Sequence, residues 1–253
     1  MIRVVNLHKR FGEKVIYRGL SLHVRRGETH VILGGSGIGK SVLLKHLLGL
    51  IEPDEGEIYI DGQRLDFRRR GELLAIRRKM GMLFQQSALF DSMTVGDNVA
   101  FYLHEHTRKS PGDIQRLVAE KLRLVNLSNV EHLMPSELSG GMQKRVALAR
   151  ALIAEPLIML YDEPTTGLDP INADAINDLI ISLQERLGMT SIVVTHDMKS
   201  AFKVAHRLSM LFDHRIIETG TPEEFQRSAN PVVRQFITGS SRGPITADMG
   251  AGR

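Results

Sequence analysis

A glycine-rich octapeptide at residues 34–41 has the residue types and spacing that point most directly to chemistry; it reads Gly34-Gly35-Ser36-Gly37-Ile38-Gly39-Lys40-Ser41. Glycines at this spacing let the backbone wrap closely around phosphates, so that successive amides point at phosphate oxygens. A helix that follows adds the partial positive charge of its N-terminus. Lys40 would reach the β- and γ-phosphates, and the Ser41 hydroxyl would bind Mg²⁺. The segment therefore predicts a binding site for ATP.

Two acidic residues, Asp162 and Glu163, follow the apolar run 158–161. A carboxylate at the end of a buried strand can hold Mg²⁺ through water, which is the role that we expect for Asp162. Glu163 is placed to orient or deprotonate the attacking water, and such a general base typically contributes about 10² to 10⁴ in rate. The alternative is an acidic pair on the surface, which the preceding apolar run disfavours.

Two further polar residues each follow a short apolar run: His196 follows 193–195, and Gln85 follows 82–84. Open α/β sheets bind their ligands at the carboxyl ends of the strands. We expect His196 to contact the γ-phosphate there, although a single histidine is more often structural. We expect Gln85 to sense Mg²⁺ or the attacking water, because an amide can both donate and accept hydrogen bonds.

A second glycine turn, Leu138-Ser139-Gly140-Gly141, precedes a segment with helical apolar spacing at 146–152. The Ser139 hydroxyl and the amides of the turn would therefore lie at another positive helix end. On composition alone, Ser-Gly-Gly is more often an ordinary turn. Since one nucleotide needs only one phosphate loop, we expect this turn to bind the γ-phosphate held by a second copy of the chain. The prediction is a homodimer that closes over two ATP molecules.

The composition is that of a globular protein with a net positive charge: 42% of the 253 residues are hydrophobic, 25% are charged, and the formal net charge is +4. No apolar run approaches the roughly 18 to 20 residues that cross a bilayer, and the first residues lack a signal-peptide pattern, so we expect a cytoplasmic location. The absence of cysteine excludes disulfides and thiolate metal sites. Arginine clusters at 68–70 and 77–79 could attract nucleic acid or an anionic membrane, but a solvated helical face is the more common reason for them.

The elements that must position the site residues alternate between strands and helices. Residues 29–33 are a short apolar run that ends in the glycine loop, and leucines at helical spacing follow at 43–48. Two more buried runs, at 157–161 and 191–195, are separated by an amphipathic stretch at 172–187, which is typical of a parallel sheet.

Alternating segments near the N-terminus favour an antiparallel sheet beside the nucleotide site, because residues 58–60 run into the hairpin signal Asp61-Gly62. The stretch from about 90 to 155 is mostly helical. We expect one domain over 1–238 and the following parts: an α/β core at 1–88 and 156–220, a helical subdomain at 89–155, C-terminal helices at 221–238, and a flexible tail or partner-binding extension at 239–253.

Together, these segments resemble the nucleotide-binding subunit of ATP-binding cassette (ABC) transporters over about residues 2–236. The resemblance implies ATP hydrolysis coupled to transmembrane transport. It implies an α/β fold of the P-loop NTPase type, with a RecA-like parallel sheet core, a flanking antiparallel β subdomain and an inserted α-helical subdomain. It assigns the motifs as follows: 34–41 as Walker A, Gln85 as the glutamine loop, 138–142 as the signature, 158–162 as Walker B, Glu163 as the catalytic base, Gly167-Leu168-Asp169 as the dimer-contacting D-loop, His196 as the switch histidine, and Phe11 as the aromatic residue that stacks on adenine.

Two positions depart from the family's common pattern. Met142 stands where the signature commonly has Gln, and Val42 stands where the Walker A serine is commonly followed by Thr. Val42 removes one hydroxyl from the α-phosphate side of the nucleotide site. Met142 cannot donate a hydrogen bond, which leaves the contacts to the second copy to Ser139 and the glycine amides. We expect activity to survive, since the residues assigned to catalysis remain.

Both departures, with the segment 84–95, are similar to the ATPase subunits of Mla-type transporters, which maintain outer-membrane lipid asymmetry. That resemblance implies phospholipid cargo and a peripheral location on the cytoplasmic face of the inner membrane. It implies a second copy, an integral membrane permease, a STAS-domain protein and an MCE-domain protein as partners, and no nucleic acid. Near Gln85, the apolar residues Leu89, Phe90 and Met93 would either dock a permease helix or pack in the core.

Three other functions remain open at this point. An ABC ATPase for another cargo would carry the same motifs. A soluble ABC ATPase acting on DNA or ribosomes is disfavoured, because the chain has one cassette and no sustained heptads in the roughly 100 residues between Lys40 and Ser139. A small-molecule kinase could use the same phosphate loop, but the turn at 139–141 and Glu163 would then have no purpose.

Overall fold

The structure is a computed structural model that describes residues 1–246. Its central sheet has six strands: β3 Thr29–Leu33, β6 Met80–Leu83, β7 Ile158–Asp162, β8 Thr190–Thr195, β9 Arg207–Phe212 and β10 Arg215–Gly220. They lie in the order β10-β9-β3-β8-β7-β6. The strands from β9 to β6 are parallel to one another, and β10 is antiparallel to β9. The sheet is therefore the parallel core that the apolar runs predict.

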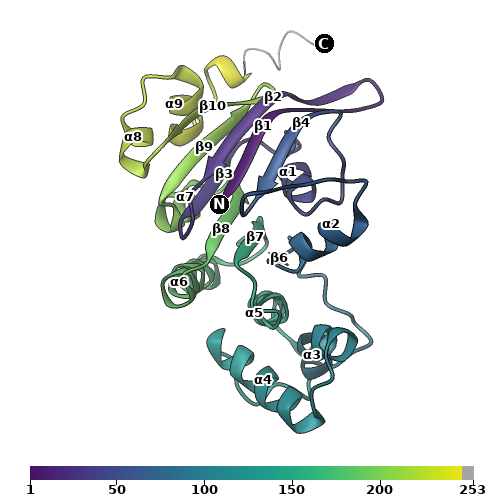
Figure 1. Cartoon of the computed structure of the whole chain (residues 1–253). Coiled ribbons are helices and arrows are strands. Elements are labelled where there is room, and N and C mark those ends of the chain that lie inside the picture. The colour runs from purple at the N-terminus through teal and green to yellow at the C-terminus, as the bar shows by residue number, and fades with distance from the viewer. Residues whose placement is uncertain (247–253) are drawn as a thin grey trace.

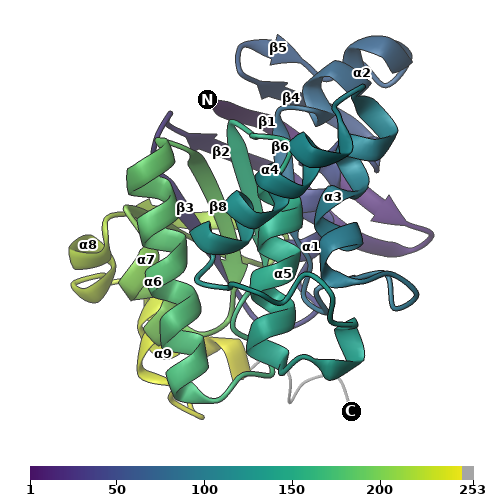
Figure 2. The same ribbon diagram turned by 90° about the horizontal axis from the view of Figure 1, so that it is seen from below.

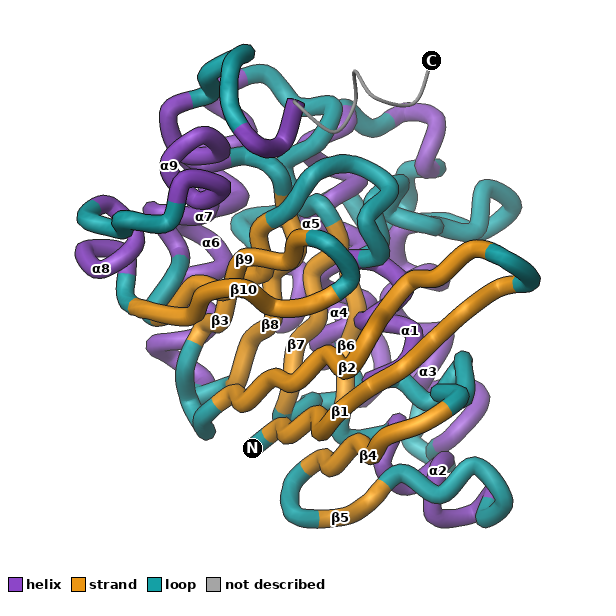
Figure 3. The backbone as a smooth tube through the Cα atoms, turned by 90° about the horizontal axis from the view of Figure 1, so that it is seen from above, coloured by secondary structure: helices purple, strands orange, loops and turns teal. Residues whose placement is uncertain are grey.

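A second, antiparallel sheet is formed by β1 Ile2–Phe11, β2 Lys14–Val24, β4 Glu55–Ile60 and β5 Gln63–Arg64, in the order β2-β1-β4-β5. Figure 3 shows its long strands running across those of the parallel sheet. Its buried and exposed residues alternate over much of β2, because one face packs on the core and the other meets solvent. The predicted flanking antiparallel sheet is confirmed.

The helices are α1 Lys40–Leu47, α2 Arg70–Arg77, α3 Val95–His106, α4 Pro111–Leu124, the 3₁₀ helix η1 Pro135–Glu137, α5 Gly140–Leu152, α6 Pro170–Leu187, α7 Met198–Val204, α8 Pro222–Gln226 and α9 Pro231–Thr238. Thr94, Ser110 and Ser139 cap α3, α4 and α5 by accepting a backbone amide bond with their side chains. Figure 1 shows α3 and α4 at the end of the molecule away from β1 and β2. The stretch between β6 and β7 is helical as expected, and the domain boundaries given above stay predictions.

The core has two parts, one on each face of the parallel sheet. In β7, Met159 and Tyr161 point to the side of α5 and α6, whereas Ile158 and Leu160 point to the side of α1 and the antiparallel sheet. This follows from the period of two along a strand. Figure 2 shows α5, α6 and α7 together on their side of β8. Because both faces of the parallel sheet are covered, its strands are mostly apolar. The strands therefore appear in the sequence as short continuous apolar runs.

Two features of the structure were not predicted from the sequence. The hairpin of β9 and β10 extends the parallel sheet by an antiparallel edge strand that no sequence pattern indicated. The predicted tail, 239–253, falls partly on 247–253, outside the described residues. Its first part bonds to α9: the Gln235 side-chain amide donates to the Ser240 carbonyl at 3.1 Å, and the Ile245 amide donates to Gln235 Oε1 at 2.7 Å.

Candidate active site

The glycine loop joins the carboxyl end of β3 to the start of α1 at Lys40. Two of its positions require glycine. Gly39 has a φ of +115°, which side chains disfavour, and a Cβ there would lie 2.9 Å from Ile16 Cγ2. A Cβ at Gly34 would lie 2.7 Å from the carbonyl oxygen of Leu211. The loop can therefore turn tightly enough to aim the N-terminal amides of α1 at a ligand.

Lys40 is folded back onto its own loop, with only 6% of the residue exposed. Its ammonium donates to the carbonyl oxygens of Gly34 at 2.8 Å and Gly35 at 2.9 Å. It also lies 3.3 Å from Glu163 Oε1. These partners satisfy a buried cation that would otherwise be costly. The ammonium therefore lies within the loop, where a phosphate could replace its acceptors.

Ser41 and Asp162 meet although they are far apart in the sequence. Ser41, in the first turn of α1, donates its hydroxyl to Asp162 Oδ1 at 2.7 Å, and Asp162 ends β7. Burial raises the pKa of Asp162 above its ordinary value, and the Ser41 bond opposes that shift. The Ser41 hydroxyl and the Asp162 carboxylate thus place two hard oxygen donors next to each other. Mg²⁺ commonly binds one or two such protein oxygens, together with substrate phosphates and water.

Glu163 lies directly after β7, with its carboxylate almost fully buried. Its Oε2 lies 3.0 Å from His196 Nδ1 and accepts from the Thr195 hydroxyl at 3.1 Å. Burial alone would raise the pKa of Glu163, but the His196 bond and the Lys40 charge outweigh it and hold the pKa below its ordinary value. His196 follows β8, the neighbour of β7 in the sheet, so both residues lie at one edge.

Lys40, Ser41, Glu163 and His196 line one pocket of about 400 Å³, whereas Asp162 is outside its described lining. Its described lining is Phe11, Lys14, Ile16, Ser36, Gly37, Gly39, Lys40, Ser41, Val42, Gln85, Glu163 and His196. Phe11 is 47% exposed, and the Lys9 ammonium lies 5.3 Å from its ring centroid. The pocket thus joins an exposed aromatic ring at one end to the phosphate loop and the carboxylate at the other.

The second glycine turn is not part of this lining. Ser139 is the exposed N-cap of α5, and its hydroxyl accepts from the Met142 amide at 3.3 Å. Gly141 packs against α6, where a Cβ would lie 3.1 Å from Asn172 Oδ1. Asp169 caps α6 by accepting the amides of Ile171 and Asn172, both at 3.0 Å. The turn and the D-loop segment therefore lie beside each other, apart from the residues that surround Lys40.

Two cationic side chains of α5 donate hydrogen bonds to the segment 85–88, which follows β6. Lys144 donates to the carbonyl of Gln85, and Arg150 donates to the carbonyls of Ser87 at 3.0 Å and Ala88 at 2.7 Å. Gln85 is one of the residues that line the pocket described above.

Of the three residues proposed for permease docking, Phe90 is exposed, whereas Leu89 and Met93 are half-buried. Phe90 contacts the exposed ring of Phe101, with 4.9 Å between the ring centroids. Leu89 packs partly against the core. Docking at this surface stays a prediction.

Several lining or supporting residues were not found from the sequence. Lys14 and Ile16 line the pocket from β2, and their only signal was a strand pattern beside Phe11. Thr195 was read as part of an apolar run, yet its hydroxyl bonds Glu163. Tyr17 gave no signal at all, although its hydroxyl reaches the glycine loop.

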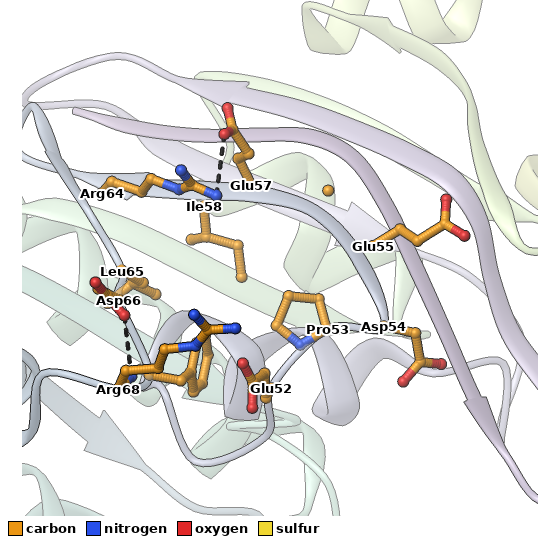
Figure 4. A pocket seen from close by; sticks show the side chains of 12 residues that line it. Glu52, Pro53, Asp54, Glu55, Glu57, Ile58, Arg64, Leu65, Asp66 and Arg68 are labelled. Carbon is orange, nitrogen blue, oxygen red and sulfur yellow. Dashed lines mark hydrogen bonds and ion pairs between the residues drawn. The ribbon is translucent and has the colours of Figure 1, made fainter.

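A separate hollow of about 390 Å³ lies beside β4 and β5 (Figure 4). Arg64 pairs with Glu57 at 3.1 Å across it, and the Arg68 amide donates to Asp66 Oδ1 at 3.0 Å. None of the predicted site residues lines it. Two of the five arginines suspected of binding nucleic acid have protein partners for their side chains: Arg69 pairs with Glu72 at 2.9 Å, and Arg77 donates to the carbonyls of Leu48 and Gly49, just after α1.

Among residues 1–246, no helix combines the length and the apolar character that a membrane-spanning segment requires.

Comparison with known proteins agrees with this geometry. Residues 17–166 match the family model described as ABC transporter. The intermembrane phospholipid transport system ATP-binding protein MlaF of Haemophilus influenzae is 44% identical over 245 residues, which is 97% of this chain and 93% of that protein. The probable ribonucleotide transport ATP-binding protein mkl of Mycobacterium leprae is 44% identical over 244 residues, 96% of this chain and 70% of that protein. A solved dimeric ATP-binding cassette in a post-hydrolysis state, bound to ADP and Pi, is 36% identical with a TM-score of 0.78, over 88% of this chain and 99% of that one.

Proposed function

Because the chain belongs to the ABC transporter family and is an ATPase of that family, we propose that two copies of it close over two ATP molecules to power phospholipid transport. One observation supports the proposed dimer. Lys40, Glu163 and His196 share a pocket, whereas the phosphate-facing turn at 139–141 is absent from its described lining. A turn that cannot serve its own chain's nucleotide is suited to the nucleotide of a second copy.

In the proposed cycle, phosphate oxygens replace the present hydrogen-bond acceptors of Lys40. The amides of the glycine loop and the Lys40 ammonium bind the β- and γ-phosphates, and the Lys40 ammonium leaves its present acceptors, the Gly34 and Gly35 carbonyls. Glu163 accepts a proton from the attacking water. His196 holds the Glu163 carboxylate from the opposite side to Lys40 and contacts the γ-phosphate. Phe11 stacks on adenine.

A magnesium ion fits the donor pair of Ser41 and Asp162, and Gln85 lines the same pocket as Ser41. When bound there, Mg²⁺ would neutralise charge on the transferring phosphate. Ser139 and the amides of Gly140 and Gly141 would complete the site from the second copy, with Asp169 at the dimer contact.

Phospholipid cargo, and a place on the cytoplasmic face of the inner membrane, are proposed from the similarity to the Haemophilus protein. The partners would be an integral permease, a STAS-domain subunit and an MCE-domain subunit. Ribonucleotide cargo is the second candidate, because the mycobacterial relative, which is named as a probable ribonucleotide transport protein, is equally similar. The test is the complex purified with its permease and placed in vesicles: ATP-dependent transfer of a fluorescent phospholipid supports the proposal, and ATP-dependent uptake of a labelled ribonucleotide without lipid transfer contradicts it.

The dimer is tested by Glu163→Gln. The amide keeps the size of the side chain but cannot take the proton, so hydrolysis should fall by about 10² to 10⁴ while ATP still binds. Light scattering should then give a dimer with ATP and a monomer with ADP. Glu185→Gln, at an exposed position of α6, is the matched control and should behave like the wild type. Normal turnover by Glu163→Gln, or a monomer in saturating ATP, would contradict the proposal.

A further inference from the structure

Tyr17 connects the antiparallel sheet to the phosphate loop. It lies in β2 with 1% of the residue exposed, and its hydroxyl donates to the carbonyl oxygen of Gly39 at 2.6 Å. Burial raises the pKa of Tyr17 above its ordinary value, so the hydroxyl keeps its proton and stays a donor. The bond joins residues that are 22 positions apart and belong to different layers of the fold.

The acceptor of this bond is the last peptide of the loop. The Gly39 carbonyl already accepts the first α1 bond, from the Leu43 amide at 3.0 Å. The Tyr17 hydroxyl takes the second lone pair, so both acceptor positions of the carbonyl are used. In a trans peptide the C=O and the following N–H point in opposite directions. Fixing the Gly39 oxygen therefore also fixes the direction of the Lys40 amide.

The Lys40 amide is one of the first four N–H groups of α1, which have no acceptor inside the helix. Such amides are the groups that a helix offers to a phosphate. A bond to the carbonyl of the same peptide also polarises the N–H, because hydrogen bonds in a chain strengthen one another. Tyr17 thus acts on the amide from behind the loop, without lining the pocket itself.

Packing leaves the hydroxyl little freedom. A Cβ at Gly39 would lie 3.1 Å from Tyr17 Cε1, so the ring already touches the loop. The ring also lies near His46 of α1, with 5.9 Å between the centroids. The adjacent residue of β2, Ile16, lines the nucleotide pocket. The ring is therefore held between the loop and α1.

We propose that Tyr17 is a positioning residue for the nucleotide's phosphates: its buried hydroxyl holds the peptide between Gly39 and Lys40 so that the Lys40 amide faces a phosphate oxygen. The inference rests on the proposed ATP site. Because this amide contact exists both before and during hydrolysis, its loss should weaken nucleotide binding and raise KM while leaving kcat nearly unchanged.

The test is Tyr17→Phe in the full chain, which removes the hydroxyl and keeps the ring. A net hydrogen bond of about 0.5 to 1.5 kcal/mol corresponds to a roughly two- to twelve-fold higher Kd for ADP and for pyrophosphate, each measured by displacement of a fluorescent ATP analogue. Pyrophosphate is included because it binds only the phosphate loop. Tyr59→Phe is the control: its hydroxyl bonds Glu57 Oε2 at 2.8 Å in β4, away from the pocket, and both Kd values should stay unchanged.

Replacing Tyr17 with 3-fluorotyrosine keeps the hydroxyl and should keep the wild-type Kd, even where Tyr17→Phe folds poorly. Wild-type binding of pyrophosphate by Tyr17→Phe would overturn the inference. So would a fall in kcat with unchanged KM, or a loss of affinity in the fluorotyrosine protein equal to that in Tyr17→Phe. Failure of the wild-type chain to bind ADP would instead overturn the proposed ATP site.

Discussion

Mixing two inactive variants can show directly whether each ATP site is shared between copies. Glu163→Gln damages the phosphate-loop half of a site, and Ser139→Arg places a cation at the positive N-terminus of α5, in the half that we assign to the other copy. Ser139 is exposed, so the larger side chain does not enter the core. Each variant alone therefore has two damaged sites in its dimer.

The expected magnitude follows from counting sites. Glu163→Gln alone should fall to about 1% of wild-type activity or lower, since loss of the base costs about 10² or more. Ser139→Arg alone should lose most of its activity, because the added cation and bulk occupy the place assigned to the γ-phosphate of the other copy. In an equal mixture that exchanges freely, about half of the dimers contain one copy of each variant. Such a dimer has one site with both substitutions and one site with neither. The mixture should regain about one quarter of wild-type activity if the two sites act independently.

The assay is steady-state phosphate release from each variant and from the mixture, at equal total protein. Ser136→Arg, an exposed position three residues earlier, controls for the added charge and should retain activity. If a chain instead contained its own complete site, no mixed dimer would have an intact site, and the mixture would show only the average of the two variants. That result would refute the assignment of the turn at 139–141 to the second copy.

Three further outcomes are expected. Burial lowers the pKa of His46 from 6.5 to about 4, so below pH 6.5 the unfolded chain binds a proton that the folded chain does not. The free energy of unfolding should therefore fall by about 2 to 3 kcal/mol between pH 6.5 and 4.5. Urea unfolding of His46→Gln should lack this part of the pH dependence. Phe11→Ala should raise the Kd for ATP by about 5- to 160-fold in an equilibrium titration, since base stacking is worth about 1 to 3 kcal/mol, while pyrophosphate binding and Phe11→Tyr stay near wild type. Gly39→Ala should lower the midpoint of thermal unfolding and ATP affinity together, because its Cβ would lie 2.9 Å from Ile16 Cγ2 and its backbone would cost at least about 1 to 2 kcal/mol. By contrast, Gly71→Ala meets nothing within 4 Å in helix α2 and should lower neither.

The sequence predicted the parallel core and the place of the site for one physical reason. The strands that carry Asp162 and Thr195 are buried on both faces, so they appear as continuous apolar runs, and the residues after them must meet at one sheet edge. That argument brought Glu163 and His196 together, and they lie 3.0 Å apart.

Other features left no such signal. The hairpin of β9 and β10 turns through Asp213 and His214, both with positive φ, rather than through the Asn-Gly or Asp-Gly pair that marks such turns. The Tyr17 bond depends on how two layers of the fold pack, which strand alternation does not indicate. Likewise, Thr195 was hidden because a polar hydroxyl inside an apolar run is read as core.

The contacts that Lys40 makes within the chain affect what an affinity measurement means. Its ammonium already has two carbonyl acceptors and a carboxylate neighbour. At the proposed site, a triphosphate would take the place of these partners, and the measured Kd would report only the difference between the two sets of contacts. A modest Kd at this pocket is thus compatible with strong individual contacts between Lys40 and the phosphates.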